Sequence, residues 1–312
     1  MTSEVPSALA QMKRFVGKHV EKEFDWNAFP RSKGHPELGR AQMRYIGAGG
    51  SPKVDDPNTL PPEHFTLSMI NLPVGHYGAS HYHDDCEEVF LMLEGLLTVG
   101  FAWGDEVIEA CLGPKDLVML PIGRPHAYRN DFTESARFSI MVGAKRPHLP
   151  IYVAHPNQSD RSFAFGAAPG KTYKYSPASD DPRQRELGAC IVRYADQPVH
   201  WHPAGFGWKV YVGEGGAPAG NFRENLVHLP KGCGVQIYQR DVEDAYLVIE
   251  GVLTVGWEVD GRVVEQRLGP KDVILNPAGR PHYFRNDGFQ DAQFMMVVGT
   301  AQEETVNFQP YR

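Results

Sequence analysis

The segment HYHDDCEEVFLMLEG, residues 81–95, places two histidines shortly before a pair of glutamates and an apolar run. His81 and His83 are two residues apart, so in a β-strand both side chains leave the same face of the sheet and can reach one ion. Glu88 leads the apolar run, and a charge that faces a core is costly unless it is paired or bound to a metal. His126, which follows a turn containing proline and glycine, is a fourth candidate. These residue types at this spacing indicate a metal site.

The chemistry of the four side chains narrows the choice of metal. Three neutral imidazoles and one carboxylate suit Fe(II), Mn(II), Ni(II), Cu(II) or Zn(II), whereas Ca(II) and Mg(II) prefer oxygen ligands. One divalent transition metal per chain is therefore expected, and the ligand types alone do not name it.

The elements that must position this site occur twice in the chain. Three segments of the first half return in the second at a constant offset of 156 residues: LEGLLTVGF (93–101) as IEGVLTVGW (249–257), LGPKDLVMLPIGRPHAYRND (112–131) as LGPKDVILNPAGRPHYFRND (268–287), and FSIMVG (138–143) as FMMVVG (294–299). In both copies, turn residues separate short segments rich in Val, Ile, Leu, Phe and Tyr, which is typical of an all-β sandwich or small barrel. The chain is thus predicted to hold two copies of one β unit.

On these residues the chain resembles the cupin superfamily, specifically its two-domain members. The family's first motif, G-x5-H-x-H-x4-E-x6-G, is matched by Gly75, His81, His83, Glu88 and Gly95, and its second, P-x-G-x2-H-x3-N, by Pro121, Gly123, His126 and Asn130. The chain departs from the family where Lys115-Asp116 replaces the usual Gly-Asp, in a turn and not in a ligand. The resemblance implies two tandem cupin barrels, also called double-stranded β-helices or jelly rolls, with His81, His83, Glu88 and His126 as metal ligands. The spacing to Gly95 favours Glu88 over its neighbour Glu87.

The division into domains follows from the repeat. Residues 1–160 are predicted to form a short N-terminal helix and the metal-binding barrel, and residues 161–312 a linker and a degenerate second barrel. The helix is expected within Ser7–Phe24, where apolar residues recur at helical spacing: Leu9, Met12, Val16 and Val20. The segment 164–186, rich in Gly, Pro, Ser and Asp, is interpreted as the connection, with room for a short strand of its own.

The second copy has lost most of the candidate ligands. His282 corresponds to His126, and Asp244 to Glu88. The other two positions depend on where a one-residue gap is placed, and hold either Ile237 and Gln239 or Tyr238 and Arg240. Neither alignment supplies a histidine there, so the ligand count argues against a second transition-metal site.

The second barrel is therefore expected to be a structural partner that supports assembly. Asp244, Tyr246 and His282 are expected to face its interior, where they need only satisfy one another, although they could also bind a polar molecule. The cluster His200, Trp201 and His202 has the spacing of a metal pair but no partner motif, and is predicted to be a loop or an edge strand.

Composition excludes several classes of function. The 312-residue chain has a formal charge of −7 and a pI near 6.0, which argues against a nucleic-acid partner. No apolar run reaches the roughly 18 residues of a membrane span, and the N-terminus lacks the layout of a secretory signal, so a cytoplasmic protein without a membrane partner is expected. The scattered cysteines are expected to be reduced and mostly structural: Cys86, Cys111, Cys190 and Cys233.

A metal in the first barrel would leave room for a small-molecule substrate. Phe90, Met92 and Tyr128 are expected to line an apolar pocket with an aromatic rim, suited to a small, flat anion such as a phenolate, enolate or diketone. Among cupins, a two-domain chain with one working site resembles mononuclear iron enzymes. The resemblance thus implies an Fe(II)-dependent dioxygenase acting on a small aromatic or enolic compound, with Glu88 also able to act as a base.

Two alternatives stay open. A Mn- or Zn-dependent isomerase or decarboxylase could use the same ligands without O2, although two-domain cupins similar to oxalate decarboxylase generally keep metals in both barrels. A non-catalytic two-domain cupin that binds a small molecule is the second alternative. Because barrels of this kind offer exposed sheet edges, a homo-oligomer is expected, with a homodimer as the favoured state.

Overall fold

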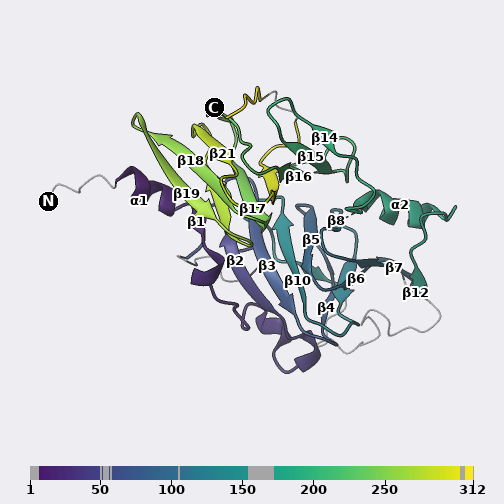
Figure 1. Cartoon of the computed structure of the whole chain (residues 1–312). Helices are drawn as coiled ribbons and strands as arrows, with labels where there is room; N and C mark the ends of the chain where they lie inside the picture. Colours follow the sequence, from purple (N-terminus) through teal and green to yellow (C-terminus); the bar gives the residue numbers. More distant parts are fainter. Residues whose placement is uncertain are drawn as a thin grey trace. The chain divides into compact units, whose positions relative to one another are not determined.

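The computed structural model of the chain describes residues 7–49, 51, 56, 58–104, 106–153, 172–302 and 306–311 (Figure 1). They form two compact units. Of the described residues, those within Glu23–Asp196 and Glu214–Asn221 form the first barrel, and those within Met1–Lys22, Gln197–Gly213 and Phe222–Arg312 form the second. Strands make up most of the regular structure of the described residues, which confirms the predicted all-β class.

The first barrel is built from two sheets. One has the strand order β13-β8-β5-β10-β3-β2, and the other has the order β11-β4-β9-β6-β7-β12. Most neighbouring strands are antiparallel, whereas β12 pairs with β7 in parallel. The strands are β2 (Ala41–Ile46), β3 (Thr66–Leu72), β4 (Tyr77–Tyr82), β5 (Glu88–Glu94), β6 (Leu97–Trp103), β7 (Glu106–Leu112), β8 (Leu117–Leu120), β9 (His126–Arg129), β10 (Ala136–Val142), β11 (Ile151–Tyr152), β12 (Thr172–Lys174) and β13 (Ile191–Val192). Two short 3-10 helices, η2 (Pro30–Ser32) and η3 (Pro36–Leu38), precede β2.

An aromatic cluster in the first barrel holds its two sheets together. The ring of Phe90, on β5, lies 5.2 Å from that of Tyr128, on β9 in the opposite sheet, and 5.1 Å from that of Phe138 on β10. All three side chains are buried. Because residues two apart in a strand share a face, this cluster also directs Glu88 and His126 into the interior.

The second barrel repeats this plan. Its sheets have the orders β1-β20-β17-β22-β16-β15-β14 and β19-β18-β21. The strands are β1 (Val16–Gly17), β14 (His200–Trp201), β15 (Gly207–Val212), β16 (Arg223–Leu229), β17 (Asp244–Glu250), β18 (Leu253–Val259), β19 (Arg262–Leu268), β20 (Val273–Asn276), β21 (His282–Arg285) and β22 (Ala292–Val298). Strand β14 is an exposed edge strand, which confirms the expectation for His200 and Trp201.

The N-terminal helix differs from the prediction in length and in the barrel it joins. Helix α1 covers only Ala8–Lys13, because Phe15 donates its N–H back to Met12 and the β-branched Val16 continues as strand β1. A short 3-10 helix, η1 (His19–Glu21), follows. Strand β1 pairs with β20, so this segment belongs to the second barrel. The sequence analysis had assigned it to the first barrel. Val20 is exposed and forms no part of an apolar stripe.

An equivalent segment completes the first barrel. Helix α2 (Pro182–Cys190) begins at Asp181, whose side chain accepts a hydrogen bond from the N–H of Arg183, and it leads into β13, which pairs with β8. The expected connection over 164–186 therefore ends inside α2 and includes the short strand β12, while residues 164–171 lie outside the described part. The boundary at residue 160 also lies outside it and stays a prediction.

Matching aspartates anchor these two added segments. Asp116 accepts hydrogen bonds from Arg193 and from the N–H of Tyr194, and Asp272 accepts from Lys18 and from the N–H of His19. Each barrel thus carries one helix-and-strand addition at the same place in its sheet. Within the described residues, no helix has the length and apolar character needed to cross a membrane.

Candidate metal centre

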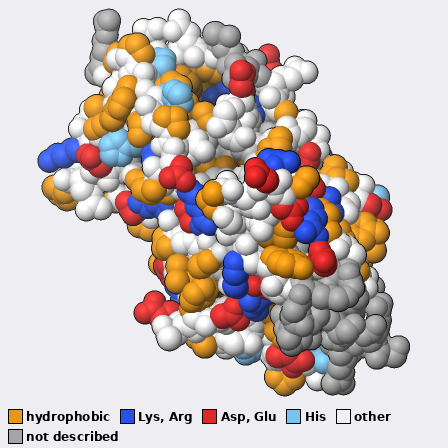
Figure 2. Space-filling model, turned by 90° about the vertical axis from the view of Figure 1, so that its right-hand side faces the viewer, with side chains coloured by type: hydrophobic (Ala, Val, Ile, Leu, Met, Phe, Trp, Pro, Cys, Tyr) orange, Lys and Arg blue, Asp and Glu red, His pale blue; other side chains and the backbone are white. Residues whose placement is uncertain are grey.

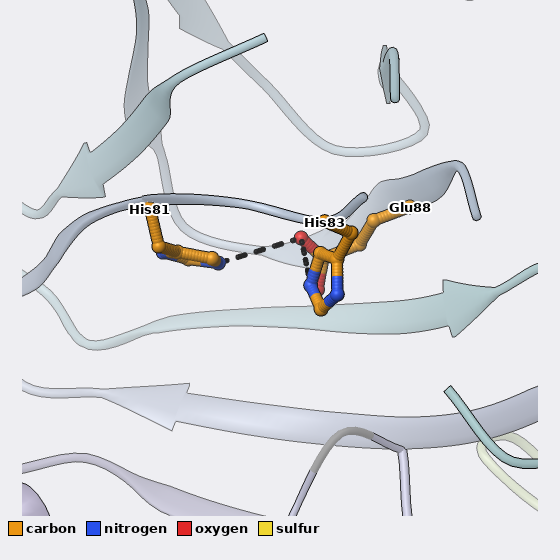
Figure 3. A group of neighbouring side chains, drawn as sticks. All are labelled: His81, His83 and Glu88. Atoms are coloured by element: carbon orange, nitrogen blue, oxygen red, sulfur yellow. Dashed lines mark ion pairs between the residues drawn. The ribbon is translucent and has the colours of Figure 1, made fainter. Parts of the chain in front are cut away.

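Three strand ends bring the four predicted ligands together. His81 lies near the end of β4 and pairs in register with His126 at the start of β9. His83 follows β4, and its carbonyl accepts a hydrogen bond from the N–H of Gly123 in the turn before β9. Glu88 begins β5. Figure 3 shows His81 and His83 on either side of the Glu88 carboxylate, with one oxygen facing both rings.

A single oxygen of Glu88 is the centre of the cluster. Its Oε2 lies 3.2 Å from Nε2 of His126 and 3.8 Å from Nε2 of both His81 and His83. The four residues are at most 6% exposed. Of these, His81, His83 and Glu88 have ligand atoms within 4.8 Å of one another, a spacing that one ion can bridge. The structure therefore brings together the four residues chosen from the sequence.

Backbone carbonyls set the tautomers of two histidines. Nδ1 of His81 lies 2.8 Å from the carbonyl of Ala79, and Nδ1 of His126 lies 2.9 Å from that of Arg124. A carbonyl only accepts, so both Nδ1 atoms carry the proton and both Nε2 atoms present a lone pair when the ring is neutral. Such partners are typical of metal-binding histidines, because they orient the ring and free the other nitrogen.

The Nε2 lone pairs of His81 and His126 therefore face a carboxylate oxygen of Glu88, which is itself an acceptor. Burial lowers the pKa of His81 and of His83 below the ordinary value, which favours neutral rings at pH 7. Burial alone would raise the pKa of Glu88, but its close contacts with the rings of His126, His81 and His83 hold that pKa well below its usual range. An ionised carboxylate surrounded by imidazole lone pairs requires a cation between them. A divalent transition metal fits this donor set.

The neighbouring glutamate points elsewhere. The carboxylate of Glu87 accepts hydrogen bonds from the N–H of Gly220 at 3.0 Å and from the side-chain amide of Asn221 at 3.1 Å. These contacts hold Glu87 away from the three histidines. The structure thus places Glu88, and not Glu87, at the centre of the cluster.

The predicted pocket residues form a packed wall. Phe90 and Tyr128 are buried, and the ring of Phe90 lies 6.4 Å from that of His126. Met92 lies two residues after Phe90 in β5 and is also buried. Burial raises the pKa of the Tyr128 phenol to about 12, so it stays neutral at pH 7. Together these side chains supply an apolar boundary beside the histidines.

Two residues near the site could not be chosen from the sequence. Tyr152, on β11, pairs in register with His81, and its ring lies 5.8 Å from the His81 ring. Arg40 is buried, with its guanidinium 3.8 Å from the ring centre of Phe29 and 5.8 Å from that of Tyr128. Neither belongs to a motif, and only the fold brings them close.

The thiol inside the motif region is inert. Cys86 is buried and donates to Asp85 at 3.2 Å. Burial, followed by this hydrogen bond, raises the pKa of the Cys86 thiol well above its ordinary value. A thiol that stays protonated at neutral pH is a poor nucleophile.

The second barrel replaces the histidines by hydrogen-bond donors. Tyr238 pairs with His282 as His81 pairs with His126, and Arg240 accepts a hydrogen bond from Gly279 as His83 does from Gly123. The gap therefore lies between Arg240 and Asp244, so Tyr238 and Arg240, and not Ile237 and Gln239, hold the two histidine positions.

Asp244 is satisfied by these donors. It is fully buried and accepts hydrogen bonds from Nε of Arg240 at 3.0 Å and from the Asn276 amide at 2.8 Å, with the phenols of Tyr238 and Tyr246 at 3.4 and 3.3 Å. Nδ1 of His282 donates to a carbonyl, and its Nε2 lies 3.1 Å from the Tyr246 hydroxyl. The guanidinium supplies the positive charge that the first barrel lacks, so this centre needs no metal.

Comparison with known proteins agrees with the doubled fold. A family model described as a cupin domain matches twice, over residues 68–143 and 225–298. No curated protein sequence matches the chain. A Bacillus subtilis oxalate decarboxylase, in work concerned with its Mn(II) centres, is similar in structure with a TM-score of 0.66 at 15% identity, over 97% of this chain and 86% of that one.

Two further structures are similar over most of their length. Lactobacillus farciminis oxalate decarboxylase, in a formate complex, has a TM-score of 0.64 at 15% identity, over 95% of this chain and 88% of that one. Vicilin from hazelnut, Corylus avellana, has a TM-score of 0.60 at 12% identity, over 92% and 86%. At these identities the likeness concerns the fold. Both repeats match the same family model and fold as the same barrel, and the chain is therefore a two-domain member of the cupin family, with its candidate metal ligands in the first domain.

Proposed function

We propose that the protein is a metalloenzyme with one metal centre, in the first barrel, and that it decarboxylates a small carboxylic acid with Mn(II) as its metal. The observation that carries the proposal is the set of three imidazole Nε2 atoms around one Glu88 oxygen, 3.2 to 3.8 Å away. The similarity in fold to oxalate decarboxylases, one of them studied for its Mn(II) centres, supports this metal and reaction class.

The four side chains would hold the metal, and the metal would supply Lewis-acid activation of a substrate oxygen. His81 and His126 are oriented for this by the carbonyls of Ala79 and Arg124. Phe90 and Tyr128 limit the access of water from the interior of the barrel, which strengthens electrostatic interactions at the site.

Glu88 is also the candidate for moving a proton. Because its pKa lies well below the usual range, the carboxylate is ionised at neutral pH and holds no proton to donate, so a role in proton transfer would be that of a base. We therefore propose Glu88 as both ligand and base. Full turnover by the Glu88→Gln variant at saturating metal would exclude the base role.

An Fe(II)-dependent dioxygenase acting on a small aromatic or enolic compound is the second candidate. The ligand set suits Fe(II) as well as Mn(II), and the Phe90 ring beside His126 offers an aromatic wall. The similar structures named above are decarboxylases and a vicilin, so they lend no support to O2 chemistry. An isomerase with the same ligands would consume no O2 and release no CO2.

The test begins with metal content. Protein purified anaerobically without a chelating tag, and its His81→Ala variant, are analysed for bound metals. The loaded protein is then assayed for CO2 release under nitrogen from oxalate and other small mono- and dicarboxylic acids, and for O2 uptake with catechols and diketones. About one manganese per chain with CO2 release supports the first proposal. One iron with O2 uptake moves the assignment to the dioxygenase, and no metal above the variant's level moves it to a binding protein.

The expected homodimer and cytoplasmic location stay predictions. Light scattering coupled to size-exclusion chromatography would test the first, and cell fractionation the second.

A further inference from the structure

A cavity of about 200 Å³ lies in the second barrel. All of its lining residues belong to that barrel, and most are apolar: Phe206, Trp208, Val227, Met296, Val306 and Phe308. An apolar cavity of roughly 150 Å³ is enough to bind benzene in an engineered protein. This cavity therefore has room for one six-membered ring with a small polar substituent.

Three aromatic rings form one wall of the cavity. The ring of Phe206 lies 6.0 Å from that of Trp208 and 5.3 Å from that of Phe308. Figure 2 shows histidine and hydrophobic side chains gathered in its upper part, where Figure 1 labels β14 and β15. Aromatic pairs attract one another beyond the area that they bury. The wall therefore favours a ligand that is itself an aromatic ring.

The charge in the cavity wall is already neutralised. Arg240 lines the cavity, but its Nε donates to the buried carboxylate of Asp244 at 3.0 Å, and its guanidinium also lies 5.9 Å from the ring centre of Phe308. Among the residues that the structure describes, no carboxylate lines the cavity. A charged ligand would lose its hydration there without gaining an ion pair, so the cavity selects against anions and cations alike.

Two uncharged polar groups also line the cavity. Nδ1 of His202 accepts from the N–H of Ala204 at 3.1 Å, so the proton of the neutral ring lies on Nε2, which can donate. The side-chain amide of Asn225, on β16, forms no hydrogen bond within the described part of the chain. An amide both donates and accepts, so a carbonyl or carboxamide group on a ligand could bond to either residue.

The first barrel has a polar pair at the same place. By the register of the strands, Gln42 of β2 and Ser68 of β3 correspond to Trp208 and Asn225. Both are buried, and the Gln42 amide donates to the Ser68 hydroxyl at 3.0 Å. Trp208 and Asn225 form no such bond with each other. The pair in the first barrel satisfies itself, whereas the second barrel leaves an amide for a ligand.

We propose that the second barrel is a binding site for a small, neutral aromatic compound that carries one carbonyl or carboxamide group. The ring would pack against Phe206, Trp208 and Phe308, and the polar group would bond to His202 and Asn225. Such a site has the usual composition of a ligand pocket, an apolar lining with a few polar groups that fix the orientation. This function goes beyond the metal centre and does not depend on it.

Isothermal titration of the full-length protein with benzamide tests the proposal. Benzoate, which is its charged isostere, and acetamide, which lacks the ring, serve as matched ligands. Asn225→Leu removes the amide, and Val306→Trp fills the cavity. Val263→Trp is the matched control, because Val263 is 52% exposed and does not line the cavity. His81→Ala removes a candidate metal ligand in the first barrel. Circular dichroism shows which variants are folded.

We expect one benzamide per chain in the wild type, in Val263→Trp and in His81→Ala. The affinity should fall about five- to tenfold in Asn225→Leu, because a hydrogen bond is lost. It should be at least about tenfold lower for benzoate, because a charge is buried without a partner. Binding should disappear in Val306→Trp and should be absent for acetamide.

Three results would each overturn the proposal. The first is no binding to the wild type at millimolar benzamide, and the second is benzoate binding as tight as that of benzamide. The third is benzamide binding that is lost in His81→Ala, which would place the ligand at the metal centre. If Val306→Trp fails to fold, Asn225→Leu decides, and an unchanged affinity for benzamide in that variant also overturns the proposal.

Discussion

Arg240 donates from Nε to Asp244 across 3.0 Å, at the place in the second barrel where His83 lies 3.8 Å from Glu88 in the first. Both pairs are buried. In the second barrel the cation is part of the chain, whereas in the first the carboxylate meets only imidazoles and needs a cation from solution. Two copies of one barrel thus satisfy the same buried carboxylate in different ways, and the difference predicts which barrel binds metal.

Removing one histidine from each barrel should have unequal effects on metal binding. His126→Ala deletes a ring whose Nε2 lies 3.2 Å from Glu88, and we expect metal affinity to fall more than about 100-fold, since even residues that only support ligands contribute 10- to 100-fold. His282→Ala is the matched control, because His282 is the equivalent residue beside Asp244. Equilibrium dialysis with Mn(II) measures both. Equal losses in the two variants would contradict a single site in the first barrel.

The repeat and its motifs were sufficient to predict which four side chains meet, because each candidate ligand lies at or next to a strand end whose register is set by local residues. His81 and His83 share a face, and Glu88 and His126 each lie two residues before a ring of the Phe90 and Tyr128 cluster. Sequence spacing therefore carried most of the geometry.

Other features depended on contacts that sequence spacing does not encode. The edges of β8 and β20 are equivalent, so nothing local decides which of them receives the strand at Val16–Gly17. The gap in the second copy could be placed on either side of Arg240, and shifting a strand by one residue reverses its faces. Only the pairing of Tyr238 with His282 decides it.

A duplicated ion pair should stabilise the two barrels unequally. Glu109 is 1% exposed and accepts hydrogen bonds from Arg129 and Lys174, whereas its equivalent Glu265, paired with Arg285, is 38% exposed. Breaking a buried pair leaves an unpaired charge, so Glu109→Gln should lower the free energy of unfolding by about 3 kcal/mol. The Glu265→Gln control should cost about 0.5 kcal/mol. Urea denaturation of each variant beside the wild type measures both.

The pH dependence of this pair has a definite sign. Burial would raise the pKa of Glu109, but the hydrogen bonds from Arg129 and Lys174 lower it below its ordinary value of 4.5. The stabilisation is therefore present above about pH 4.5 and is lost as the pH falls through the folded-state value. The difference between wild type and Glu109→Gln should shrink on acidification. A difference that is constant from pH 7 to pH 3 would show that packing and not charge is responsible.

A buried glutamate in the second barrel should act in the opposite direction. Glu224, on β16, is 2% exposed, and burial raises its pKa to about 8. The folded state then holds a proton that the unfolded state releases above its ordinary value of 4.5, so stability falls as the pH rises from 4.5 to 8. Glu224→Gln keeps the shape without the charge. It should be more stable than the wild type at pH 7 by about 3 kcal/mol, and equal to it at pH 4. The exposed Glu258→Gln should change stability by less than about 0.5 kcal/mol at either pH.

Restoring the histidines should give the second barrel a metal site. The double variant Tyr238→His, Arg240→His places imidazoles at the positions equivalent to His81 and His83, beside Asp244 and His282. It also removes the guanidinium that supplies the positive charge there, so the Asp244 carboxylate would face imidazole lone pairs as Glu88 does in the first barrel. We expect the manganese content to rise from about one to about two per chain, because the donor set then becomes three imidazoles and one carboxylate.

The single variant Tyr238→His is the control. Because Arg240 still lies 3.0 Å from Asp244, the manganese content of this variant should stay at about one per chain. A second metal in the single variant would mean that the arginine does not exclude the ion. No second metal in a folded double variant would mean that the shorter side chain of Asp244 cannot replace that of Glu88.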